Sequence, residues 1–455
     1  MDEDVPKVPP DYRLMGPSDD GTVGDILKEL DAKSARQRLQ ALIAEWLRME
    51  NVVVLTAAGC SVTSGGKVMA NLESSVLATV SILADCTENL RGFINDRLAN
   101  RNKSGQPAFE EWLSFLVNAA FVGSAKQSPF ASFEWKKKPG PTARELEWFV
   151  EVVGKAIFAE CALRLQVAPP TAASANEIAP HLAFLSKLIA RDSNLGRIHL
   201  FTLNYDTLFE QALEALGVQY FDGFSGRAEA KFDPSVYGLD IYYPGEIAEG
   251  RVRRFDKFLH YYKLHGSIHW HVVEDELRSR HPNLAIVDKY QSADQEKKGE
   301  ELQKIIAALP SVGILPTSNK FTQTLSMPYA HLFRLFQIRL SAPQTFLLVL
   351  GYGFGDDHIT RMIETALMNP SLVMLVVEPN PDSPTIKRIQ SYKDLGKRAF
   401  VLTSSREAFA AKQFEKATFD DFARSIMPDV QWLDDFLRLR RFEKQIRAGS
   451  SGTDT

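Results

Sequence analysis

Five short apolar runs, each followed by a turn or a helix-like stretch, constrain the fold of this chain more than any other feature. They span residues 52–55, 198–203, 345–350, 373–377 and, more weakly, 399–402. Uninterrupted apolar runs of this length are typical of parallel strands that are buried on both faces. Strands that alternate with helices form a parallel sheet covered by helices. The sequence therefore predicts an α/β fold with a Rossmann-like, doubly wound parallel sheet.

Around these runs the 455 residues divide into three parts. Residues 1–50 are predicted to form an N-terminal arm, flexible over 1–21, and a helix. Residues 51–405 form the α/β domain, which carries a large helical insert at about 70–190. Residues 406–455 form a C-terminal helical tail.

Two stretches inside the domain have a different character. Residues 222–262 are rich in Gly, Tyr and Asp, and we expect them to be irregular. Residues 281–305 are highly charged, and we expect a surface excursion there.

Composition excludes several function classes. The chain has 53 Lys and Arg against 57 Asp and Glu, a net charge of −4, which argues against strong, non-specific nucleic-acid binding. Cys60, Cys86 and Cys161 form no CxxC pair, so we expect neither a zinc ribbon nor any other zinc site. Sparse cysteines, an acidic, Pro-rich N-terminus and the absence of an 18-residue apolar run predict a cytoplasmic protein with no membrane span.

Small residues follow the first apolar run. Ala57, Ala58, Gly59 and Ser61 form a strand-to-helix turn in which a ligand can approach the backbone closely. The N–H groups of such a turn can hold phosphate oxygens. A tight turn without a ligand remains the alternative.

Two polar motifs follow. Asn204 and Asp206, after the second run, lie two residues apart and can converge on one ligand, or they can shape and cap the turn. His265 precedes a glycine and can serve as a general base. A metal site built with His269 and His271 is disfavoured, because no carboxylate or cysteine partner lies near in the sequence.

The last two motifs follow the strands predicted at 345–350 and 373–377. Gly351 and Gly353 flank a tyrosine and precede Phe354, which indicates a special backbone or close ligand approach. Glu378 and Asn380 stand where an acidic residue binds a ribose hydroxyl in dinucleotide folds, although Glu378 can also be a solvated loop residue. Five such loops at one sheet edge predict a dinucleotide site.

These residues resemble the motifs of a sirtuin-type catalytic domain. The family's GAGxS loop resembles residues 57–61, its TQNxD element 202–206, its His-Gly pair 265–266 and its late Gly-rich loop 351–355. More narrowly, the segments KLHGSIHW, ILPTSNK and GYGFGDDH are similar to segments of the sirtuin-like proteins of bacterial anti-phage defence. That resemblance implies an NAD⁺ hydrolase that works as a homo-oligomer with a HerA-type ATPase or another defence partner.

The resemblance also assigns roles. Asn204 would position a water near the ribose C1′, Asp206 would hold the nicotinamide carboxamide, and His265 would act as general base. The implied function is cleavage of NAD⁺ to ADP-ribose and nicotinamide, with NAD as substrate, which depletes NAD in abortive infection. Two departures keep alternatives open. Ala57 replaces the family's first glycine, which favours a module that senses NAD or ADP-ribose without turnover, and the missing four-cysteine zinc module disfavours protein deacylation.

Overall fold

The chain is described here from a computed structural model, which covers most of the sequence. The described residues are 10–17, 23–125, 134–135, 138–165, 178–192, 194–226, 229–248, 251–274, 276–280, 285–309, 328–394, 398–411 and 416–429.

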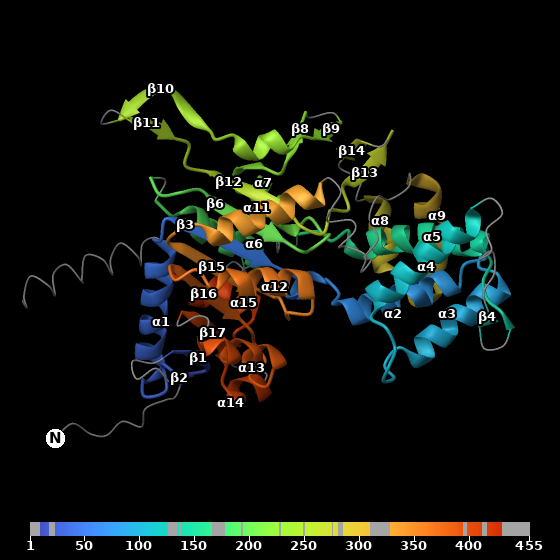
Figure 1. Cartoon of the computed structure of the whole chain (residues 1–455), viewed down its shortest axis with the longest axis horizontal. Helices are drawn as coiled ribbons and strands as arrows, with labels where there is room; N and C mark the ends of the chain where they lie inside the picture. The colour runs from blue at the N-terminus through green and yellow to red at the C-terminus, as the bar shows by residue number, and fades with distance from the viewer. Residues whose placement is uncertain are drawn as a thin grey trace, which may run out of the picture.

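The centre of the molecule is a nine-stranded sheet with the order β2-β1-β17-β16-β15-β3-β6-β12-β7 (Figure 1). The seven strands from β17 to β7 pair in parallel, and β1 and β2 pair antiparallel at one edge. The predicted Rossmann-like α/β fold is therefore confirmed. The strands are β1 Tyr12–Pro17, β2 Val23–Asp25, β3 Asn51–Thr56, β6 Ile198–Thr202, β7 Gln219–Phe221, β12 Phe258–Lys263, β15 Thr345–Leu350, β16 Leu372–Val377 and β17 Ala399–Ser404.

The strand order reverses at β3. From β3 the chain builds β6, β7 and β12 on one side, and it then returns to build β15, β16 and β17 on the other. In open parallel sheets, ligands bind outside the carboxyl ends of the strands at such a reversal. The topology therefore points to the ends of β3 and its two neighbours, β15 and β6.

Hydrophobic side chains cover both faces of the sheet. On β3, Val53 and Leu55 join one core cluster, and Val52 and Val54 join the other; all four are fully buried. Alternate residues thus face opposite layers. This two-sided burial explains why the strand sequence is apolar at consecutive positions.

Helices form the layers on the two faces. The longer ones are α1 Ala32–Leu47, α2 Met69–Ser81, α3 Glu88–Asn100, α4 Phe109–Ser124, α5 Ala143–Cys161, α6 Pro180–Ile189, α7 Leu208–Ala215, α8 Ala285–Ser292, α9 Gln295–Ala308, α11 Tyr329–Ser341, α12 Asp357–Ala366 and α13 Pro384–Gln390. Shorter segments are α14 Arg406–Ala410, α15 Phe419–Asp421, the π-helix η5 Phe422–Ile426, and the 3₁₀ turns η1 Ala58–Cys60, η2 Val62–Ser64, η3 Pro234–Gly238 and η4 Ser391–Asp394.

Helices α2 to α5 form a helical module at one end of the sheet (Figure 1). Helix α6 falls inside the insert predicted at 70–190, but it packs on α7 and η5 and shares a core cluster with α1. The charged stretch 281–305 was wrongly predicted to be a surface excursion. It contains α8 and most of α9, which pack against α5, because Tyr290, Leu302 and Ile305 supply a buried apolar stripe.

Two further sequence predictions are wrong. Part of the expected flexible arm is strand β1, which pairs with β17 and buries Tyr12 and Leu14. The region 222–262 is not irregular throughout, because it ends in the central strand β12 and contributes short outer strands. These outer sheets are built from β8 Phe224–Ser225, β9 Ala230–Phe232, β10 Tyr242–Ala248, β11 Arg251–Arg254, β13 Trp270–Val273 and β14 Glu276–Ser279, and a separate hairpin from β4 Glu134–Trp135 and β5 Lys138–Pro139.

The C-terminal tail is described as far as residue 429. The predicted aromatic and basic part, residues 430–455, lies outside the described residues. Among the helices that are described, none has the length and apolar character needed to cross a membrane.

Candidate functional site

The loops after adjacent strands are tied together at the carboxyl edge of the sheet. Three backbone hydrogen bonds of 2.9–3.0 Å continue the strand ladders beyond β15, β3, β6 and β12. Their donors and acceptors are Ala57 N and Leu350 O, Leu203 N and Thr56 O, and Leu264 N and Thr202 O. The sheet thus brings the first four predicted motifs to one place.

The loops after β3 and β15 touch through their backbones. Gly59 N donates to Gly351 O at 3.0 Å, and a Cβ placed on Gly59 would lie 2.6 Å from the Cα of Gly351. Gly351 itself has a positive φ of 65°. A side chain at either position would push the two loops apart, so both glycines are required for this contact.

Ala57 and Ala58 lead into this contact in a compact conformation. Ala57 is extended, with φ −142°, and is 6% exposed. Ala58 opens the 3₁₀ turn, and Cys60 closes that turn with its thiol buried under the loop. The turn therefore orders the backbone of the predicted phosphate loop without a side-chain cap.

A buried polar cluster joins the first two motifs. The Asn204 side-chain amide donates to Ser61 Oγ at 2.9 Å and to Ala57 O at 3.1 Å, and Ser61 Oγ donates to Asp206 Oδ2 at 2.7 Å. Asn204 and Asp206 are each 7% exposed, and Ser61 is 2% exposed. One amide, one hydroxyl and one carboxyl group therefore meet beside the glycine contact.

A buried ion pair supports this cluster from β12. Lys263 Nζ lies 2.7 Å from Glu210 Oε1 on α7 and also donates to Asp206 O. Tyr261 OH donates to the other Glu210 oxygen at 2.8 Å. Burial raises the pKa of Asp206 above its ordinary value, and the positive charge of Lys263 and the Ser61 hydrogen bond oppose that rise.

His265 lies two residues beyond β12, before a glycine with φ 91°. Its Nε2 lies 3.2 Å from Oδ2 of Asp356, which follows the glycine-rich segment after β15. The sequence offered no carboxylate partner for this histidine within its own motif. The two motifs meet because the strands that carry them end at the same edge of the sheet.

The glycine-rich segment after β15 is partly open and partly buried. A Cβ placed on Gly353 would have no other atom within 4 Å, so the backbone of Gly353 is accessible. Phe354 is 3% exposed, belongs to a core cluster and adopts φ 56°, and its carbonyl accepts from Arg388 at 3.0 Å. Its side chain therefore packs in the core, and the prediction that Phe354 lines the cofactor site stays a prediction.

Glu378 and Asn380 stand apart from the polar cluster. Glu378 Oε1 accepts from the backbone N–H of Asn380 at 3.0 Å, so these two residues bond to each other at the end of β16. Burial raises the pKa of Glu378. The structure places them at the same edge, one strand further from β3 than Gly351.

The described residues contain no group of three or more His, Cys, Asp or Glu side chains placed to hold a metal. All three cysteines are free. His269 is buried and His271 is half-buried on β13, in the outer sheet.

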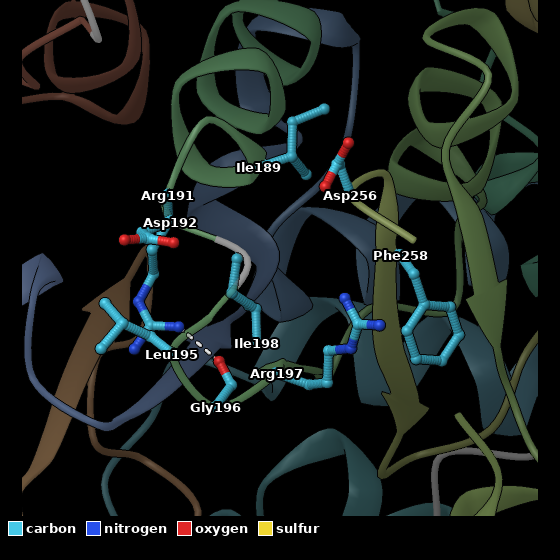
Figure 2. Close-up of a pocket in the computed structure, with 9 residues that line it drawn as sticks. All are labelled: Ile189, Arg191, Asp192, Leu195, Gly196, Arg197, Ile198, Asp256 and Phe258. Atoms are coloured by element: carbon cyan, nitrogen blue, oxygen red, sulfur yellow. Dashed lines mark hydrogen bonds between the residues drawn. The ribbon is translucent and has the colours of Figure 1, made fainter. Parts of the chain in front are cut away.

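A separate hollow lies at the opposite edge of the sheet (Figure 2). It is lined by residues that precede β6 and β12, including Arg191, Arg197 and Phe258. Arg191 donates to four backbone carbonyls, and burial lowers its pKa to about 10. Arg197 bonds Asp240 and two carbonyls and stacks on Phe258. Both guanidinium groups therefore stabilise loops, and the candidate site is at the other edge.

Comparison with known families agrees with this placement. Residues 198–398 match the SIR2-like domain. No curated protein matches the sequence. The matched region includes the motifs after β6, β12, β15 and β16, whereas the loop at 57–61 and the helical module precede it. SIR2-like domains belong to NAD-dependent enzymes, so the match supports a sirtuin-like relationship and an NAD-related activity in general.

Proposed function

We propose that this protein hydrolyses NAD⁺ at the bond between nicotinamide and ribose, giving ADP-ribose and nicotinamide. The observation that carries the proposal is the direct contact of Asn204, Ser61 and Asp206 beside the Gly59–Gly351 contact. The glycine contact keeps this loop compact, and its small residues let a ligand approach the backbone closely. The polar cluster supplies groups that can orient a carboxamide and a water.

The chemistry needs few groups. The oxygen of a water forms a bond to the ribose C1′ while the bond to the pyridinium nitrogen breaks. The electron pair of that bond neutralises the nicotinamide ring, and the proton of the water passes to His265. The transition state resembles an oxocarbenium ion, as in glycoside hydrolysis, and the Asp206 carboxylate would stabilise it electrostatically.

The test uses substitutions at two of these groups. Asn204→Ala and His265→Ala should each lower NAD⁺ cleavage by about 10²–10⁴-fold, the usual contribution of a positioned catalytic group. Products from pure protein are separated by chromatography. Asn194→Ala and His271→Ala are matched controls away from the polar cluster and should cleave NAD⁺ at the normal rate. Normal turnover in His265→Ala would exclude this histidine as the base.

The same assay separates the alternative functions. A sensing module, which Ala57 in the phosphate loop favours, would bind NAD or ADP-ribose in calorimetry and release no nicotinamide. A deacylase would consume an acetyl-lysine peptide together with NAD⁺. For the hydrolase we expect nicotinamide release that is independent of any peptide. Following the resemblance to anti-phage proteins, we further propose that this reaction depletes NAD during abortive infection.

A further inference from the structure

A basic and an acidic side chain from distant parts of the chain meet at the carboxyl edge of the sheet. His265 follows β12, and Asp356 follows β15, with β3 and β6 between these strands. Nε2 of the imidazole and Oδ2 of the carboxylate are 3.2 Å apart. The two side chains are 8% and 17% exposed. Little water therefore surrounds the pair, which strengthens its electrostatic interaction.

Asp356 is held in place independently of the histidine. Its Oδ1 accepts from the backbone N–H groups of His358 and Ile359, at 3.0 and 3.3 Å, as the N-cap of α12. Its carbonyl oxygen accepts from Tyr352 OH at 2.9 Å. The helix N-terminus also favours negative charge at this position. One carboxylate oxygen thus fixes the residue, while the other faces the imidazole.

We propose that Asp356 is the positioning residue for His265 in the proposed NAD⁺ cleavage, on which this inference rests. Its carboxylate holds the imidazole as the tautomer that carries hydrogen on Nε2, so that the lone pair on Nδ1 is the base. When Nδ1 accepts the proton of the water, the imidazolium is stabilised by the carboxylate, which itself stays ionised. An aspartate has this role toward the histidine of hydrolytic triads.

A second role, that of a helix cap, must be separated from this one. Asn caps helices about as well as Asp, so Asp356→Asn keeps the cap and removes the charge. The matched control is Asp357→Asn, which removes a carboxylate from the exposed next position, the first residue of α12. Thermal unfolding of both variants should resemble that of the unchanged protein.

Kinetics then measure the positioning role. Asp356→Asn should lower kcat about 10²-fold with KM for NAD⁺ changed less than about threefold, because the lost interaction strengthens as the imidazole gains its proton. Its pH profile should also move. The imidazolium loses an anionic partner, so the acidic limb of kcat shifts to lower pH. An Asp356→Asn protein with the kcat and pH profile of Asp357→Asn would overturn the proposal.

Nuclear magnetic resonance tests the pair without turnover. In the unchanged protein, ¹⁵N shifts of the His265 side chain, assigned with His265→Ala, should show hydrogen on Nε2. In Asp356→Asn the pKa of this imidazole should fall. Hydrogen on Nδ1 in the unchanged protein, or an unmoved titration, would refute the positioning role. If the unchanged protein releases no nicotinamide, the proposed hydrolysis fails, while these spectra still decide whether Asp356 positions His265.

Discussion

At the scale of single residues, Lys263 is a buried charge beside the candidate site. Its side chain is 4% exposed, that of Glu210 is 8% exposed, and their charged atoms lie 2.7 Å apart. Lys263 also donates to the backbone oxygen of Asp206. Burial of such a pair costs desolvation energy, and removal of one partner leaves the other charge buried without a counter-ion. The pair therefore links the stability of this region to the electrostatics of the site.

We predict that Lys263→Met destabilises the protein by about 3–5 kcal/mol, because Glu210 keeps a buried charge with no cation beside it. The double variant Lys263→Met, Glu210→Gln should recover a large part of that loss, since residue 210 then carries no buried charge. Urea unfolding of the two single variants and the double variant gives the coupling free energy. A double variant that is less stable than Lys263→Met alone would contradict this account.

At the scale of elements, α6 carries an imidazole where an apolar group would be expected. His181 is fully buried between the rings of Phe209 and Phe419, whose centroids lie 4.8 and 5.1 Å away. Among the described residues neither ring nitrogen of His181 has a hydrogen-bond partner. Burial lowers its pKa from 6.5 to about 4, so the folded protein holds this histidine neutral.

The sign of the pH effect follows from this lowered pKa. Above pH 6.5 the histidine is neutral in both the folded and unfolded states, and its contribution to stability is fully present. As the pH falls from 6.5 toward 4, the unfolded state takes up the proton first, and stability is lost. At pH 5 we expect a loss of about 2 kcal/mol from this residue. His181→Leu should remove that loss, which urea unfolding at pH 8 and pH 5 measures.

A control separates this effect from general acid sensitivity. His271→Leu changes a half-buried histidine on β13 and should leave the difference between pH 8 and pH 5 as it is in the unchanged protein. If His181→Leu shows the same difference as well, the buried imidazole is not its source.

At the scale of the whole molecule, the helical module is tied to the loop that follows β3. Glu160 on α5 accepts from Lys67 at 2.5 Å, from Ser75 at 2.6 Å and from Tyr290 at 2.7 Å. Burial alone would raise the pKa of Glu160, but these hydrogen bonds bring it below its ordinary value. Lys67 follows the loop that Ser61 and Gly66 close through a 2.8 Å backbone bond. A movement of the module would therefore reach the candidate site.

Regulation at this scale is the last prediction. An unrestrained NAD⁺ hydrolase would drain its own cell, so we propose that activity depends on a homo-oligomer and a HerA-type ATPase or another defence partner. A chain ending at residue 429 keeps the contacts of Lys187 with the carbonyls of Ala423, Arg424 and Met427. We expect this shortened chain to fold but to assemble less, as light scattering would show. A full-length protein that is a monomer and cleaves NAD⁺ at the same rate with and without the ATPase would refute the proposal.

The sequence by itself determined the parallel sheet and most of the strand-end residues. Buried parallel strands need uninterrupted apolar runs, and residues 346–350 are apolar at every position. Gly351 is favoured locally by its positive φ, whereas Gly59 is required by its close contact with Gly351 from a distant part of the chain. Asn204 and Asp206 stand directly after a strand, where ligands of such sheets bind.

Only the tertiary structure decided the role of β12 and the pairing of charges. The strand's sequence, FLHYYK, shows no apolar run, yet all six residues are buried. Tyr261 and Lys263 bond to Glu210, and Tyr262 bonds to His199, so these polar groups have buried partners. The partners of Lys263 and His265 lie 53 and 91 residues away, on α7 and after β15. Such pairs form because the order of strands brings their ends together, and that order depends on long-range packing that no local pattern encodes.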